Sequence, residues 1–252
     1  MTYEITRDLL ALLNSGNKAS ITPGYREVIE SLEHPGFSYN TAAMEGMTQT
    51  LFSNKLMIAH NLIHNAIDEA KGAARVNIIA ERYADPVLQE KMRRHVGDEL
   101  RHSKMFADCV GYTGYDMEQN DEPESEKEVD DVFEFDDDLK TFMCRVHSIE
   151  IRSWTMLRLY MDILRKKNDP SLLKLIPIFQ QIMADEINHV RYTGLEVNKW
   201  IAEDPSVAQT LVTCFQHTNR ETWHDLANMA NYLADTFPSL VPDTQQAEAL
   251  AA

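Results

Sequence analysis

Two short segments of the sequence combine residue types that bind metal ions. They are Asp98-Glu99-Leu100-Arg101-His102 and Asp185-Glu186-Ile187-Asn188-His189, and both have the form Asp-Glu-x-x-His. Residues three positions apart project from one face of a helix, so the Glu and His of each segment can reach a single ion. Each Glu also lies on an apolar stripe, where an ionised carboxylate is costly unless something pairs with it. Two such copies therefore predict a metal site.

Two further carboxylates complete a candidate site for two metal ions. In di-metal helical bundles, each of the other two helices supplies one Glu. Residues that lie level in a helical hairpin are equidistant from its turn, and (69 + 99)/2 = 84 and (150 + 186)/2 = 168 both fall at Asp-Pro turn signals. Glu81 fails this test, because its midpoint with Glu99 is 90. The predicted ligand set, which would also be the catalytic set, is Glu69, Glu99, His102, Glu150, Glu186 and His189.

The chemistry of this set favours iron or manganese. Four carboxylates and two imidazoles suit a pair of iron ions, a pair of manganese ions or a mixed pair. Zinc prefers fewer ligands with more nitrogen or sulfur.

Four residues around the set have open roles. Asp98 and Asp185 each precede a candidate His by four positions, so they either accept the second imidazole proton of that ligand or form plain salt bridges, for instance with Arg101. His95 and His147, about one turn before Glu residues of the set, are either additional ligands or histidines held by hydrogen bonds.

The elements that must position these residues are long helices. Apolar residues recur at helical spacing, and Asp-Pro at 85, 169 and 204 combines an N-cap with a proline at the first helical position. No strand-like alternation is present, so the sequence predicts an all-α fold. The expected long helices span about 40–83, 86–106, 137–167, 170–200 and 205–235.

The charge of the chain is concentrated in one segment. The 252 residues contain 24 Lys and Arg against 40 Asp and Glu, a net charge of -16, and residues 116–138 hold 13 of the acids with one Lys. This segment predicts a solvated crossover between two helical hairpins; a cation-binding or partner-docking segment is the alternative. The acidic balance argues against nucleic acid as the main partner, because phosphate neutralisation needs a basic surface.

These features predict four parts. We expect an N-terminal extension over 1–40, a four-helix bundle over 41–200 that includes the crossover at 116–138, an additional C-terminal helix packed on the bundle over 201–236, and a tail over 237–252. Two hairpins joined by a long crossover is a known bundle layout with metal sites in its core.

The location expected from the sequence is the cytoplasm. Cys109, Cys144 and Cys214 are odd in number and widely spaced, which predicts no disulfide framework. The N-terminus has no signal-peptide pattern, and no stretch of about 18 apolar residues occurs, so we expect no membrane partner.

Over residues 50 to 200 the pattern resembles the ferritin-like di-iron carboxylate superfamily, which includes rubrerythrins, ribonucleotide reductase small subunits, desaturases and bacterial multicomponent monooxygenases. Asp98-Glu99-Leu100-Arg101-His102 is similar to the Asp-Glu-x-Arg-His of the monooxygenases and desaturases, and Asn188 replaces Arg in the second copy. The run from His95 to His102 is similar to a His-x-x-x-Glu-x-x-His run of di-iron arylamine N-oxygenases, where the extra His is a ligand. In that family the run lies in the second Glu-x-x-His helix, whereas here it lies in the first.

This resemblance implies a ferritin-like four-helix bundle whose six ligands hold two iron ions. The implied activity is that of an oxidoreductase, an oxygenase or oxidase that uses O2 as cosubstrate on a small organic molecule, by hydroxylation or N-oxygenation. Electrons would come from an external reductase or ferredoxin, because the sequence has no dinucleotide fingerprint and no Cys-x-x-Cys module. A homodimer is compatible with the additional helix.

The alternative is a ferroxidase or iron-handling protein with no organic substrate. Ferritin-type cages use short four-helix subunits, so the additional C-terminal helix and the N-terminal 40 residues favour a dedicated enzyme. A di-metal hydroxylase that modifies RNA is disfavoured by the acidic charge, and a metal-free helical scaffold would need four acids aligned on core faces by accident.

Overall fold

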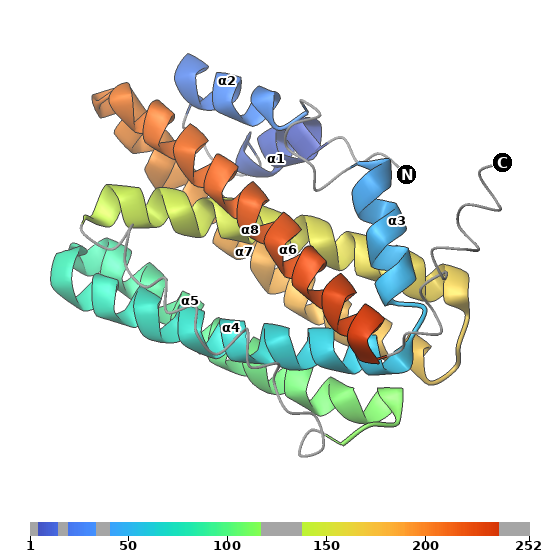
Figure 1. The fold of residues 1–252 in the computed structure, drawn as a ribbon. Helices are drawn as coiled ribbons and strands as arrows, with labels where there is room; N and C mark the ends of the chain where they lie inside the picture. Colours follow the sequence, from blue (N-terminus) through green and yellow to red (C-terminus); the bar gives the residue numbers. More distant parts are fainter. Residues whose placement is uncertain (1–4, 15–19, 34–40, 117–137, 237–252) are drawn as a thin grey trace, which may run out of the picture.

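The computed structural model describes residues 5–14, 20–33, 41–116 and 138–236 (Figure 1). Within these ranges the chain forms α-helices and short 3-10 helices and no strand, so the predicted all-α class is confirmed. Most of the predicted acidic crossover, all of the predicted tail and residues 1–4, 15–19 and 34–40 of the predicted extension lie outside the described residues. The helices are α1 (Ile5–Asn14), α2 (Pro23–Ser31), α3 (Ala42–Leu51), α4 (Lys55–Tyr83), α5 (Pro86–Cys109), η1 (Val110–Thr113), α6 (Leu139–Lys167), η4 (Leu172–Lys174), α7 (Leu175–Glu203) and α8 (Ser206–Thr236).

Two long helical hairpins, α4–α5 and α6–α7, lie side by side and form the centre of the helical bundle (Figure 1). The first turn is capped by Asp85, whose side chain accepts hydrogen bonds from the backbone N–H groups of Val87 and Leu88 at 2.8 and 3.0 Å. The second turn uses Asn168, which adopts the left-handed conformation (φ 53°) common at helix C-termini. Both turns fall where the sequence placed them.

The first predicted long helix is divided into two. A turn at residues 52–54 separates α3 from α4, and the Asn54 side chain caps α4 by accepting a hydrogen bond from the backbone N–H of Leu56 at 2.8 Å. Helical spacing continues across this break, so the apolar pattern alone does not reveal it. The prediction of one helix from about 40 to 83 is therefore wrong at its start.

The fourth predicted helix begins later than expected. The Asp169 side chain accepts a hydrogen bond from the Ser171 backbone N–H at 2.9 Å, but the next turn is the 3-10 helix η4, and α7 begins at Leu175. Pro177 explains the shift, because it has no N–H and is tolerated only in the first turn of an α-helix. The proline therefore requires α7 to begin close to it.

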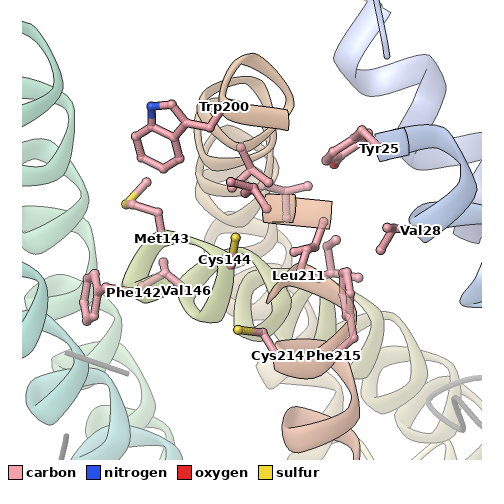
Figure 2. Close-up of a cluster of buried hydrophobic side chains, with 14 of the residues drawn as sticks. Tyr25, Val28, Phe142, Met143, Cys144, Val146, Trp200, Leu211, Cys214 and Phe215 are labelled. Carbon is pink, nitrogen blue, oxygen red and sulfur yellow. The ribbon is translucent and has the colours of Figure 1, made fainter. Parts of the chain in front are cut away.

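The two N-terminal helices are part of the hydrophobic core. Leu9 and Leu13 of α1 and Tyr25 of α2 are fully buried in a cluster that also includes residues of α6, α7 and α8. Figure 2 shows this cluster, with Cys144 of α6 and Cys214 of α8 among its side chains. All three cysteines are buried and free.

Helix α8 packs along α6. Ser148 and Thr218 join the two helices by a hydrogen bond of 2.6 Å between their hydroxyl groups, and Arg145 pairs with Glu221. No helix among the described residues has the length and apolar character that a membrane span requires.

Candidate metal centre

The structure brings all six predicted ligands together between the two hairpins. Together with His95 they form two overlapping groups, and in each group one ligand atom per side chain lies within 4.8 Å of the others. The first group is Glu69, Glu99, His102 and Glu186. The second group is His95, Glu99, Glu150 and His189. Glu99 belongs to both groups, so its carboxylate lies between two candidate ion positions.

The burial of the cluster is uneven. Glu99, His102, Glu150, Glu186 and His189 are all buried, with 6% or less of their surface exposed. Glu69 of α4 is half-buried. Glu69 is therefore the least buried member of the predicted ligand set.

Each aspartate of the two motifs contacts the histidine of the opposite motif. Nε2 of His102 lies 3.2 Å from Oδ2 of Asp185, and Nε2 of His189 lies 3.2 Å from Oδ2 of Asp98. The sequence led us to expect each aspartate near the histidine four residues later on its own helix. Because α5 and α7 run antiparallel, the aspartate of one motif lies level with the histidine of the other.

Arg101 joins the two aspartates. Its Nη2 lies 2.7 Å from Oδ1 of Asp98 and 2.9 Å from Oδ2 of Asp185. The hydrogen bond from His189, together with the interaction with Arg101, lowers the pKa of Asp98 to about 2. Both roles proposed from the sequence, imidazole acceptor and salt-bridge partner, are therefore combined in these aspartates.

These contacts determine which nitrogen of each histidine can bind an ion. A carboxylate paired with arginine accepts hydrogen bonds, so Nε2 of His102 and Nε2 of His189 donate to the two aspartates, and Nδ1 of each faces the other ligands. Nδ1 of His102 lies 3.3 Å from Oε1 of Glu186, and Nδ1 of His189 lies 3.2 Å from Oε1 of Glu99. Imidazole nitrogens and carboxylate oxygens, all of them atoms that bind metal ions, thus face one another.

Four buried atoms at this place have no hydrogen-bond partner among the described residues. They are Glu99 Oε1, His102 Nδ1, Glu186 Oε2 and His189 Nδ1. Buried polar atoms are nearly always hydrogen-bonded in folded proteins, so four unsatisfied polar atoms in one cluster call for an explanation. A cation between them satisfies all four, and the residues present therefore fit a metal pair.

The protonation equilibria of the cluster agree with this interpretation. Burial raises the pKa of Glu99 to about 7. Burial, with repulsion from Glu150 and Glu99, raises the pKa of Glu186 well above its usual value. Burial also lowers the pKa of His102. Burial opposes the charge of His189, but hydrogen bonds with Asp98, Glu150 and Glu99 outweigh it and raise the pKa of His189. The metal-free cluster therefore retains protons on Glu99, Glu186 and His189, and cations would displace them.

His95 belongs to the cluster. Its Nε2 lies 2.7 Å from Oε1 of Glu99 and 3.3 Å from Oε1 of Glu150, and its ring stacks on that of His189 with 3.8 Å between centroids. Its other nitrogen, Nδ1, lies 2.7 Å from the hydroxyl group of Tyr192. Of the two additional histidines considered from the sequence, His95 is the one placed to bind an ion.

His147 lies in a separate, fully hydrogen-bonded network. Its Nε2 is 2.7 Å from the hydroxyl of Tyr25, and its Nδ1 is 2.8 Å from Oγ1 of Thr193. Burial lowers the pKa of His147 to about 3, so the ring is neutral. It belongs to neither ligand group. The alternative role considered from the sequence, a histidine held by hydrogen bonds, fits these contacts.

Sequence reasoning missed Tyr192. Its hydroxyl contacts a candidate ligand, and it follows His189 by three positions, which places it one turn further along α7. That spacing was a usable signal, because residues one turn from a ligand face the same side of the helix.

The sequence matches no protein-family model, and it has no match among curated proteins or solved structures. The function is therefore inferred from the cluster itself.

Proposed function

We propose that the cluster binds two iron ions and that the protein is a non-haem di-iron oxidoreductase, which uses O2 to oxidise a small organic substrate. The observation that carries this proposal is the set of four buried polar atoms, on Glu99, His102, Glu186 and His189, that have no hydrogen-bond partner among the described residues. These atoms belong to two ligand groups that share Glu99, an arrangement suited to a carboxylate lying between two ions.

The charge balance of the cluster supports two divalent ions. The carboxylates of Glu69, Glu99, Glu150 and Glu186 carry four negative charges when ionised, and two divalent cations neutralise them. An oxygen-rich set with imidazole suits iron or manganese, and a mixed pair has the same charge. Zinc is a poorer fit because it prefers fewer ligands.

The four helices that supply the ligands support a ferritin-like bundle. Each hairpin contributes one helix with a single Glu (α4 or α6) and one helix with Glu-x-x-His (α5 or α7). This distribution is that of di-iron carboxylate bundles.

Bound iron would supply O2 binding and electrons, chemistry that the amino acids cannot provide. The residues of this chain hold and orient the ions: Asp185 and Asp98 keep Nδ1 of His102 and His189 directed at the centre, and Arg101 holds both aspartates. Burial of the cluster excludes bulk water. The electrons come from a separate reductase, ferredoxin or small reductant.

The test is metal analysis of the purified full chain followed by stopped-flow spectroscopy. We expect about two irons per chain and a transient absorption change when the reduced protein meets O2. Many irons per chain in a large assembly would instead indicate an iron-storage protein, and no stable iron binding would contradict the proposal. Reconstitution with manganese in parallel tests which metal the site prefers.

A further inference from the structure

A pocket lies between α4, α6 and α8, on the side of the bundle where Glu69 is half-buried. Its volume is about 80 Å³ when counted as the space open to the centres of water molecules, and about 680 Å³ when counted as all the space between atoms, open solvent included. A single water needs roughly 10–15 Å³ on the smaller of these measures, so the pocket has room for a small organic molecule. We call it the α8 pocket, because α8 forms its outer wall.

The α8 pocket leads to the candidate metal centre. Glu69 is both a member of one ligand group and a residue of the pocket wall. Two other wall residues lie about one helical turn from ligands: Phe106 follows His102 by four positions, and Ser153 follows Glu150 by three. A molecule in the pocket would therefore lie next to the centre.

The wall of the pocket has an apolar part and a charged part. The buried side chains of Phe106, Leu157 and Leu226 form apolar wall, and Phe106 is the one a turn from a ligand. The exposed Asp68 and the half-buried Asp225 supply carboxylates. An occupant with one apolar end and one polar end matches this division.

The charges of the wall favour a positively charged end. Asp68 and Asp225 bear negative charge besides Glu69, and Arg152 is the guanidinium among the described wall residues. Arg152 lies 3.9 Å from Asp225, a loose ion pair, and His64, 3.2 Å from Asp68, adds positive charge only when it is protonated. Since two metal ions would neutralise Glu69 with the other ligands, the remaining wall has a surplus of carboxylate, which repels an anion and attracts a cation.

We propose that the α8 pocket binds a small organic cation with an apolar body, of the alkylammonium type. Its ammonium group pairs with Asp225 and Asp68, and its apolar end lies against Phe106 and Leu157, beside Glu69. The assignment of this molecule as substrate rests on the proposed di-iron function, whereas its binding does not require the metal.

The experiment compares three probes of equal chain length by calorimetric titration: hexylamine, hexanol and hexanoate. Each is titrated into the metal-free full chain and into the chain loaded with two divalent ions. We expect hexylamine to bind most tightly and hexanoate least. Hexanoate binding as tightly as hexylamine would overturn the assignment of a cation.

Two variants locate the binding site. Asp225→Asn should weaken hexylamine binding by about fivefold, leave hexanol unchanged and strengthen hexanoate, because it removes one negative charge from the pocket wall. Met229→Trp adds bulk to the half-buried rim residue of α8 and should weaken all three probes. The control is Asp108→Asn, which removes an exposed carboxylate of α5 paired with Lys104, and it should change none of the affinities.

The outcomes separate this proposal from the proposed function. Amine binding that both variants weaken, in a chain that does not hold two metal ions, would contradict the di-iron function and leave the pocket assignment standing. Two bound irons together with amine binding that neither variant changes would overturn the pocket assignment alone.

Discussion

Two sets of buried polar side chains, one around His147 and one around Glu99, differ in how their polar atoms are satisfied, although His147 lies only about one helical turn before the ligand Glu150 on α6. In one group, both ring nitrogens of His147 have hydrogen-bond partners, Tyr25 and Thr193. In the other, His102 and His189 each have an aspartate at Nε2 and no hydrogen-bond partner at Nδ1 among the described residues. Both groups are buried and both neighbour Glu150, so burial and proximity do not distinguish them.

A buried histidine by itself does not indicate a metal site. The difference between the two sets shows that buried polar atoms without a hydrogen-bond partner do. Burial of a polar group costs desolvation free energy, which a hydrogen bond or a bound ion can offset. Hydrogen bonds within the protein offset this cost in the His147 network. In the centre around Glu99, bound protons or cations must offset it. We therefore expect mutations in the centre to change metal binding and mutations in the His147 network to change stability.

The largest expected effect is loss of the metal pair in Glu186→Ala. This change removes a carboxylate from a group of four ligands, and we expect the iron content to fall from about two per chain to less than one. Elemental analysis after reconstitution and desalting measures it.

The matched control for that experiment is His147→Gln. It removes a buried histidine from the satisfied network and should keep about two irons per chain while lowering the free energy of unfolding. Two tightly bound irons in Glu186→Ala would show that the assigned site is wrong.

Much of this centre could be predicted from the sequence, because its main determinants are local. The Asp-Pro turns and the equal distances of paired residues from those turns place Glu69 level with Glu99 and Glu150 level with Glu186. Helical periodicity then requires the histidines to face the same interior. The structure brings these six residues together for the same reasons.

The contacts that could not be predicted depend on how separate helices meet. The pairing of Asp98 with His189 requires knowing that α5 and α7 are antiparallel neighbours, and the partner of His147 is Tyr25, 122 positions earlier in the chain. Helical spacing gives the face of a helix, but it does not give the identity of the helix packed against that face.

The second prediction concerns acid stability. The folded protein holds His147 neutral, with its pKa lowered to about 3, whereas the unfolded chain protonates it near its usual value of about 6.5. The unfolded state therefore binds more protons as pH falls, and stability is lost between those two values at up to about 1.4 kcal/mol per pH unit. From about pH 6 to about pH 4 this one group should cost the metal-free protein about 2.5 kcal/mol.

Denaturant unfolding of the metal-free wild type and His147→Gln at several pH values measures this effect. Between pH 6 and pH 4, the free energy of unfolding of His147→Gln should fall by about 2.5 kcal/mol less than that of the wild type. His224→Gln, which changes an exposed histidine of α8, should retain the wild-type pH dependence. Equal pH dependence of wild type and His147→Gln would contradict the neutral, buried state of His147.

A third, smaller effect is expected at the aspartates that hold the histidines. Asp185→Asn weakens the acceptor for His102 Nε2 and removes one carboxylate partner of Arg101. Metal affinity should fall by about 10- to 100-fold, equivalent to about 1.4–2.7 kcal/mol, while the number of sites stays the same. Competition with a chelator measures the affinity, and Asp108→Asn should match the wild type.

A larger loss for Asp108→Asn than for Asp185→Asn would mean that the Asp–His contacts do not orient the ligands.

The smallest expected effect is at Gly194, where the satisfied network packs most closely. A Cβ there would lie 2.9 Å from Cε1 of His147, 2.9 Å from the hydroxyl oxygen of Tyr25 and 3.0 Å from Cδ2 of Leu13. Gly194→Ala should therefore cost about 1–3 kcal/mol through overpacking, reduced by about 0.5–1 kcal/mol because alanine favours a helix.

Thermal unfolding compares this variant with Gly97→Ala, which changes an exposed position of α5 where a Cβ meets nothing within 4 Å. Gly97→Ala should be slightly stabilising and Gly194→Ala destabilising, and both should keep their metal ions. A loss of metal in Gly194→Ala would show that the two groups are coupled through Thr193, whose hydroxyl donates to the His189 carbonyl at 2.7 Å and accepts a hydrogen bond from Nδ1 of His147. Retention of metal would show instead that the bundle supports the satisfied and the unsatisfied histidines independently.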